Sequence, residues 1–391
     1  MACPDKLTDN KQESQCLVRL CHAPQPGDTG STDFAAGHMT PAMAADYLQN
    51  GRVVMRSFAE TLKELYPCDD LTARLTDFFL SVTPEANAAS VSKKIRNWVL
   101  GKNCPCCRED IFRIAFALDL DEQQLNYLLS LCTDYCVQYR DSGEIILVWF
   151  LRNGKSYREA TEFYASLPPV PESGLEYNRH TSRLTHEVRA QFQTIWNLED
   201  LRICYEKNLD KFGSMHLRAY YYFNNFLNLL IHPTPSWDSE APEPDYSLEA
   251  VMKTYLSFQV PSGRSRADYT LVQKLLKQNW PNATSIKNIR NHKEDVPRKL
   301  LLLLYVVTEN EAAGNDLYRE LDEEYVPLKE RVEYHWWTLN AILEDCGMAC
   351  LDPRNATDWL ILYAISSNPE ESMSERLEQV IACVFDSAKE Q

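Results

Sequence analysis

A basic segment over residues 90–108 carries the residue types that could recognise nucleic acid. Arginine and lysine bind phosphates and guanine edges, and asparagine binds the edge of adenine. The segment contains no acidic residue, although the chain has a formal net charge of -16. Its cations are Lys93, Lys94, Arg96, Lys102 and Arg108.

A helix over 90–100 is predicted to position these side chains. Ser90 can cap its start, and Gly101 can end it in the left-handed conformation. Val91, Ile95, Trp98 and Val99 recur at the spacing of one helix face, which predicts that this face is buried. The predicted DNA-binding residues lie on the other face or just beyond the helix: Ser92, Lys93, Lys94, Arg96, Asn97 and Lys102.

A second segment repeats this pattern. KNIRNHKEDVPRKLLLLL, over 287–304, parallels KKIRNWVLGKNCPCCREDIF, over 93–112. Thr284 or Ser285 can cap the second helix, and its isoleucines, Ile286 and Ile289, are expected to point inward. The predicted outward residues, also assigned to DNA binding, are Lys287, Arg290 and Asn291.

Downstream of each basic segment, residues 125–151 match residues 339–365 without a gap. Agreement over one register indicates a duplicated supersecondary unit. The identical pairs are Leu125 with Leu339, Asn126 with Asn340, Cys132 with Cys346, Cys136 with Cys350, and Arg140 with Arg354.

The first copy resembles the lambda-repressor-like (Cro and repressor, Xre-type) helix-turn-helix family. The resemblance rests on SVSKKIRNWVLGKNCPCCRE followed by IFRIAFALDLDEQQLNYLL. It implies a recognition helix over 90–100, a preceding helix over 71–80, and closing helices over 108–118 and 122–131. The whole chain is also similar to long, uncharacterised bacterial helix-turn-helix proteins with two such modules, a group that implies no activity.

Cysteine-rich CPCC, over 104–107, could indicate metal or redox chemistry. Zinc sites usually show a second cysteine pair at a matching distance, which is missing here. Cys132 and Cys136 have helical spacing, so loop and core thiols are the favoured interpretation. The eight histidines form no catalytic or metal motif, and no phosphate-binding glycine loop occurs. We expect no enzyme activity, no cofactor and no bound metal.

The composition predicts an all-α fold. Only 12 glycines occur in 391 residues, and helix-favouring residues dominate. Proline-rich stretches divide the chain, which predicts two diverged helix-turn-helix-like modules flanking a central helical segment. The predicted units are a flexible tail over 1–43, module 1 over 44–166, a linker and central helical segment over 167–245, and diverged module 2 over 246–391.

Two functions follow from these patterns. The first is a DNA-binding transcriptional regulator; the alternative is a helical interaction or scaffold protein that keeps the helix-turn-helix shape without binding DNA. The acid-free basic segment favours the first, and the acidic charge of the whole chain favours the second. A protein partner or self-association is expected through the central and C-terminal helices. No apolar run approaches the ~20 residues of a membrane span, and the N-terminus is polar, so a cytoplasmic protein without membrane contact is expected.

Overall fold

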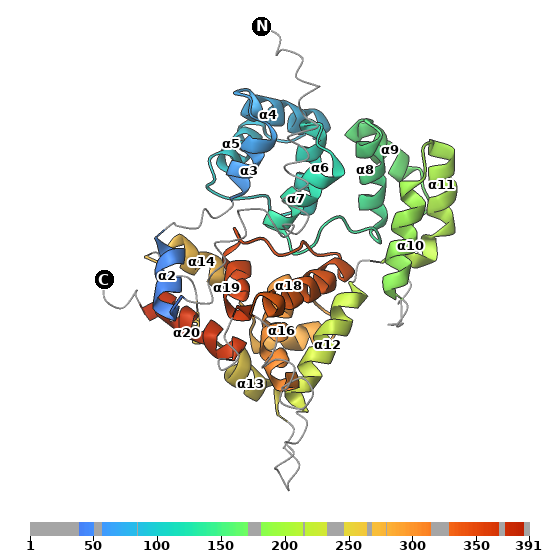
Figure 1. Ribbon diagram of the computed structural model, residues 1–391. Helices are drawn as coiled ribbons and strands as arrows, with labels where there is room; N and C mark the ends of the chain where they lie inside the picture. Colours follow the sequence, from blue (N-terminus) through green and yellow to red (C-terminus); the bar gives the residue numbers. More distant parts are fainter. Residues whose placement is uncertain are drawn as a thin grey trace.

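The computed structural model confirms the all-α prediction over the residues that it describes (Figure 1). No strand occurs in this part of the chain, where one isolated bridge is the sole β pairing. No described helix is long and apolar enough to cross a membrane. The described residues are 39–50, 57–83, 85–170, 181–213, 216–232, 246–263, 268–278, 280–313, 328–366 and 372–386.

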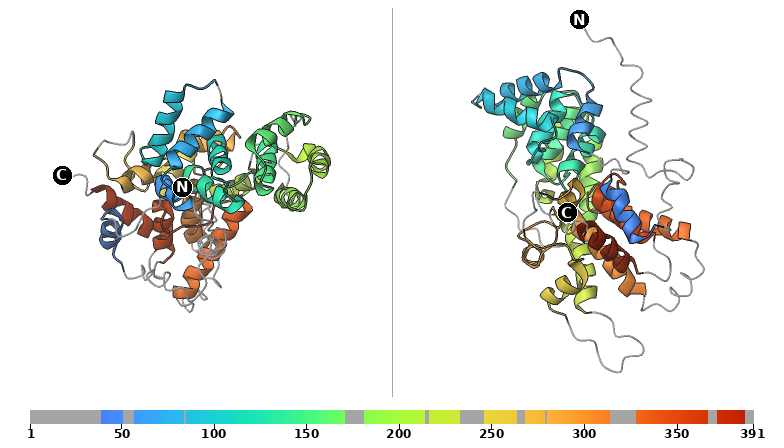
Figure 2. Two further views of the ribbon diagram at one scale, coloured as in Figure 1. Left: turned by 90° about the horizontal axis from the view of Figure 1, so that it is seen from above. Right: turned by 90° about the vertical axis from the view of Figure 1, so that its left-hand side faces the viewer.

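One hydrophobic core holds together the helices in the upper part of Figure 1, which we call the N-terminal bundle. Helix α10 and helix α11 form the outermost part of this bundle, as the view from above in Figure 2 shows. The helices are α3 (Phe58–Leu65), α4 (Leu71–Val82), α5 (Ala88–Val99), α6 (Arg108–Ala117), α7 (Glu122–Cys132), α8 (Ser142–Arg152), α9 (Tyr157–Ala165), α10 (Thr181–Gln193), α11 (Leu198–Lys207) and the short η2 (Leu209–Lys211).

A second hydrophobic core forms the lower part of the molecule, the C-terminal bundle. Its longest apolar stretch, 300–307, is buried throughout within one helix. The elements are α2 (Pro41–Gln49), α12 (Leu217–Ile231), α13 (Leu248–Val251), the π-helical turn η3 (Met252–Leu256), α14 (Leu271–Lys277), α15 (Ala283–Arg290), α16 (Arg298–Ala313), α18 (Leu328–Asp345), α19 (Ala356–Ile365) and α20 (Met373–Asp386).

The two cores do not follow the boundaries predicted from proline-rich stretches. Helix α2 begins at Pro41, within the predicted tail, and packs against α20 of the C-terminal bundle. The predicted central segment is divided, because α10 and α11 join the N-terminal core whereas α12 packs on α16. Proline marks where a helix stops, but it carries no information about the core on which the helix packs. Residues 1–38, which are most of the predicted tail, lie outside the described residues, as do 171–180 and 233–245 within the predicted linker and central helical segment.

Helices α7 and α8 repeat as α18 and α19, with matching contacts 214 residues apart. The Asn126 side chain accepts a hydrogen bond from the Val137 backbone amide at 2.7 Å. Likewise, the Asn340 side chain accepts one from Leu351 at 2.8 Å. Asn126 with Asn340 is one of the pairs in the gapless sequence match, so these contacts support the predicted repeat. A common origin of the two units stays a prediction.

The repeat does not extend to the packing of the preceding helices. Helix α4 packs against α5, as a helix-turn-helix arrangement requires, whereas α14 packs mainly against α19 and α2. The contact that a helix-turn-helix pair would need is therefore present in the N-terminal bundle, and the assignment of that motif stays a prediction. In the C-terminal bundle, the helix before the second basic segment, α14, packs mainly against α19 and α2 instead.

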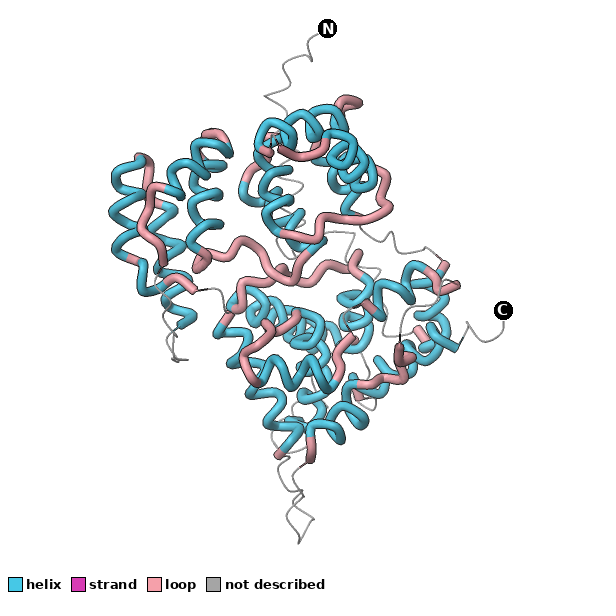
Figure 3. Tube along the Cα trace, turned by 180° about the vertical axis from the view of Figure 1, so that it is seen from behind, coloured by secondary structure: helices cyan, strands magenta, loops and turns pink. Residues whose placement is uncertain are grey.

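Two loops lie between the bundles, one after α7 and one after α18 (Figure 3). Tyr135 and Met348 form an antiparallel bridge there, and the Cys136 amide donates to the Gly347 carbonyl at 3.0 Å. Cys136 thus lies in a loop beyond the end of α7 at Cys132, and the predicted helical relationship of these two cysteines is wrong. Two cysteines four positions apart cover only one helical turn, so their spacing is weak evidence for a helix.

Candidate nucleic-acid interface

Helix α5 starts two residues before the predicted recognition helix. Its cap is Asn87, whose side chain accepts a hydrogen bond from the Ser90 amide at 3.1 Å, so the prediction of Ser90 as the cap is wrong. Both residues are good caps, and the local sequence did not decide between them. The predicted end of the helix is confirmed, since Gly101 has a φ of 68°.

The apolar face of α5 fixes its orientation against α4. Ile95 and Trp98 are buried, and Val91 and Val99 pack at the margin of the same core, as predicted. The Trp98 ring meets Phe79 of α4 edge-on, with ring centroids 5.7 Å apart. An aromatic contact of this kind restricts rotation of α5 about its axis. The opposite face is consequently directed away from the core.

Three cations on or beside that opposite face are exposed: Lys93, Arg96 and Lys102. No residue in the described part of the chain forms an ion pair with any of the three. Ser92 and Asn97 are half-buried beside them. Exposed cations without an internal anion are free to bind an external one.

Lys94 differs from its neighbours because it contacts the protein. Its ammonium lies 2.7 Å from the buried carboxylate of Asp110 and 4.9 Å from the centroid of the Trp98 ring. Both contacts favour the cation in this position. Lys94 therefore joins α5 to the first turn of α6, and this internal role competes with the predicted role in DNA binding.

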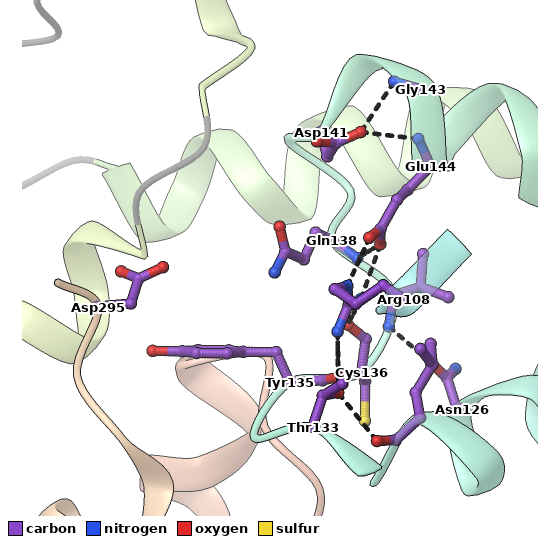
Figure 4. A network of polar contacts seen from close by, with 12 residues as sticks. Arg108, Asn126, Thr133, Tyr135, Cys136, Gln138, Asp141, Gly143, Glu144 and Asp295 are labelled. Carbon is purple, nitrogen blue, oxygen red and sulfur yellow. Dashed lines mark hydrogen bonds and ion pairs between the residues drawn. The ribbon is translucent and has the colours of Figure 1, made fainter. Parts of the chain in front are cut away.

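Arg108 is also engaged within the protein (Figure 4). Its guanidinium binds both carboxylate oxygens of Glu144, at 2.5 and 2.8 Å. It also donates to the carbonyls of Tyr135 and Cys136, each at 2.7 Å, and to the Thr133 hydroxyl at 3.0 Å. Arg108 thereby ties the start of α6 to the loop after α7 and to α8, and it does not contribute to an exposed basic surface.

Glu144 is held for this contact by its own surroundings. The Asp141 side chain caps α8 by accepting from the Gly143 and Glu144 amides, and the Gln138 amide donates to the Glu144 carboxylate at 2.8 Å. The cap and the backbone contact orient the carboxylate toward Arg108, as Figure 4 shows. Sequence reasoning missed this pair. The signal was present, because Glu144 aligns with Asp358 in the gapless match, so both copies have an acid at this position.

The second basic segment occupies α15. Asn282 caps this helix by accepting from the Ser285 amide, so the prediction of Thr284 or Ser285 as the cap is wrong. Ile286 and Ile289 are buried as predicted. The three residues predicted to bind DNA are exposed, and they are Lys287, Arg290 and Asn291.

An acidic residue lies close to α15. The Glu294 carboxylate accepts hydrogen bonds from Asn288, at 2.6 Å, and from Ser285, at 3.2 Å. This anion binds polar groups of the helix itself and lowers the positive potential around it. The surface of α5 has no corresponding acid within its segment and is the stronger candidate for phosphate binding.

Comparisons of the chain with protein-family models, with curated proteins and with solved structures found no match.

Proposed function

We propose that this protein binds DNA through the exposed face of α5 and acts as a transcriptional regulator. The observation that carries the proposal is that Lys93, Arg96 and Lys102 are exposed and have no ion-pair partner among the described residues, in a chain of strongly negative net charge. The helix that bears them packs on α4 through Trp98, which is the support that a recognition helix needs.

Several other arginines of the N-terminal bundle are paired with an acid, unlike Arg96. Five of them form ion pairs with acidic residues, including the highly exposed Arg158, which binds Glu162 one helical turn away. Arg96 is exposed without such a partner among the described residues. Exposed Lys63 of α3 and Arg189 of α10 also have no ion pair among the described residues. The distinguishing feature of α5 is that Lys93, Arg96 and Lys102 lie together in a segment without acids, which leaves a local positive surface that phosphates can approach.

Binding of the full-length protein to labelled duplex DNA, measured by fluorescence anisotropy at low salt, tests the proposal. Arg96→Ala should weaken binding, whereas Arg158→Ala removes the same charge from α9 and should leave binding unchanged. The proposal is abandoned if the wild-type protein binds no pool of genomic fragments at low salt, or if the two variants lose affinity equally.

A protein-interaction function is the second candidate, because apolar side chains are exposed on α11 and on the turn that precedes it. These elements lie at the edge of the molecule (Figure 2). Trp196 is 76% exposed and Ile203 is 54% exposed. Aromatic and aliphatic residues exposed together are typical of protein contact surfaces. Light scattering of the wild type and of Trp196→Ala separates the two candidates, since self-association through this surface would be lost in the variant while DNA binding would remain.

A further inference from the structure

One large apolar side chain is exposed beside the cations of α5. Leu100, which directly follows the last residue of this helix, is 57% exposed. Among the described residues from 57 to 152, it is the sole large aliphatic or aromatic residue with an exposed side chain. All the others in that range are buried or half-buried, so Leu100 is an exception in this part of the bundle.

The backbone places Leu100 in line with the exposed cations. Its amide donates to the Arg96 carbonyl at 3.0 Å, so the helical geometry continues to this residue. Residues seven positions apart on a helix point in directions that differ by only about 20°, and residues four apart are neighbours. Leu100 is therefore aligned with Lys93 and lies one turn beyond Arg96. The exposed face of α5 thus presents two cations followed by one apolar side chain.

The end of the helix does not use the Leu100 side chain. The chain reverses at Gly101, where φ is 68°. The amides of residues 101 and 102 donate to carbonyls of the last helical turn, at 3.0 and 2.9 Å, and these backbone hydrogen bonds cap the helix. Trp98, which is buried against Phe79, holds this end of α5 on the core. The Leu100 side chain is consequently available for a contact outside the protein.

Duplex DNA offers one apolar group at the edges of its bases. In the major groove, thymine presents a 5-methyl group, whereas the other three bases present hydrogen-bond donors and acceptors. One helical turn rises about 5.4 Å, and successive bases of a strand are about 3.4 Å apart. A side chain one turn beyond Arg96 can therefore reach a base one or two positions away from the base that Arg96 faces.

We propose that Leu100 is a specificity-determining residue of the DNA site and contacts the methyl group of a thymine one or two base pairs from the base that Arg96 faces. This inference rests on the proposed function, since it requires α5 to enter the major groove.

Charge complementarity favours duplex DNA as the occupant of this face. Exposed Lys93, Arg96 and Lys102 lie around Leu100, and residues 90–108 contain no acid. The face therefore fits a polyanion that also presents a small apolar group. An anionic membrane surface would need a broader apolar face, because its binding strength scales with the apolar area that is inserted. Leu100 alone supplies little such area.

Duplexes that differ by one methyl group test the proposal on the full-length protein. The probe is the site that the wild type selects from a pool of randomised duplexes, with each thymine replaced in turn by deoxyuridine, which lacks the 5-methyl group. Fluorescence anisotropy measures the affinity. One replacement should weaken binding about fourfold, as expected for the loss of one buried carbon group. The other replacements should have little effect.

Variants of the protein assign that loss to Leu100. Leu100→Ala should bind the thymine and uracil forms of the site with equal affinity, because the side chain that contacts the methyl group is removed. Leu100→Met keeps a long apolar side chain and should retain the discrimination. Leu271→Ala is the matched control, since Leu271 is 65% exposed at the start of α14 in the C-terminal bundle, and it should behave as the wild type does. Circular dichroism and the unfolding midpoint of Leu100→Ala should be unchanged, because the side chain is exposed.

The outcomes distinguish this inference from the proposed function. The role of Leu100 is overturned, and DNA binding stands, if the selected site contains no fixed thymine or loses no affinity on any thymine replacement. It is also overturned if Leu100→Ala discriminates thymine from uracil as the wild type does, or if the wild type binds duplexes without selecting a sequence. A wild type that binds no duplex overturns both proposals.

Discussion

Arg298 donates two hydrogen bonds to the carboxylate of Asp358, at 2.6 and 2.8 Å, in the interior of the C-terminal bundle. The guanidinium also binds the carbonyls of Ala349 and Cys350. Arg108 makes the same set of contacts in the N-terminal bundle, to Glu144 and to two consecutive carbonyls. Each bundle therefore has a half-buried arginine that joins a helix start, a loop and a later helix: Arg108 joins α6 to α8, and Arg298 joins α16 to α19.

Removal of either acid should destabilise its bundle strongly. Glu144→Gln and Asp358→Asn leave a largely buried guanidinium without its counterion, which typically costs about 3–5 kcal/mol. Chemical denaturation followed by circular dichroism measures the loss. Glu162→Gln is the control, because its partner Arg158 is 84% exposed and a surface pair contributes only about 0–1 kcal/mol. A loss for Glu144→Gln no larger than for Glu162→Gln would contradict the assignment of a structural ion pair.

The matching contacts of the two aligned segments could be predicted from the sequence, because the alignment between them is long and has no gap. Residues 125–151 and 339–365 align without a gap, and identical residues such as Asn126 and Asn340 make the same backbone contact in each copy. Helical periodicity also located the buried face of α5, since Ile95 and Trp98 repeat at a regular spacing. The order and spacing of neighbouring residues were sufficient to predict the matching segments and the buried face of α5.

Contacts between distant segments could not be predicted in this way. The packing of α2 on α20 and of α14 on α19 depends on shape complementarity over long stretches of chain, which no local period encodes. The same limit applies to the candidate interface. Lys94 and Arg108 have the residue type of the exposed cations, and only their contacts with Asp110 and Glu144 distinguish them.

Lys94→Ala should therefore lower stability, in contrast to Lys93→Ala. The first change leaves the Asp110 carboxylate, which is 2% exposed, without its nearest cation, at a cost of about 1–3 kcal/mol. The second removes an exposed side chain and should change the free energy of unfolding by less than about 0.5 kcal/mol. Parallel urea denaturation of both variants is the measurement. Equal stability of the two proteins would show that the contact of Lys94 with Asp110 contributes nothing.

Lys299 should make stability depend on pH in the alkaline range. Burial lowers the pKa of its ammonium from 10.5 to about 8, against the opposing influence of Asp134 and Asp358. Between these two pH values the unfolded chain binds more protons at this site than the folded protein. The contribution of Lys299 to the free energy of unfolding is therefore unfavourable below pH 8. It becomes more favourable as the pH rises from about 8 to about 10.5.

The difference in unfolding free energy between the wild type and Lys299→Met isolates this effect from the other groups that titrate in the same range. Denaturation of both proteins at several pH values from 7.5 to 10.5 should show a difference that grows in favour of the wild type. A difference that is constant with pH would mean that Lys299 keeps an ordinary pKa in the folded protein.

Salt dependence gives the sharpest prediction for DNA binding by α5. Each phosphate contact adds about 0.9 to the slope of log affinity against log salt on duplex DNA, because a bound cation releases counterions. If Lys93 contacts a phosphate, Lys93→Ala should reduce the slope by about one and weaken binding similarly on all sequences.

If Arg96 contacts a base, Arg96→Ala should cost about 1–3 kcal/mol on a selected site and less on random DNA. Both variants should remain folded, since both side chains are exposed. Anisotropy titrations at several salt concentrations measure the slopes. An unchanged slope for Lys93→Ala, together with equal losses for Arg96→Ala on all DNA, would remove α5 as the recognition helix.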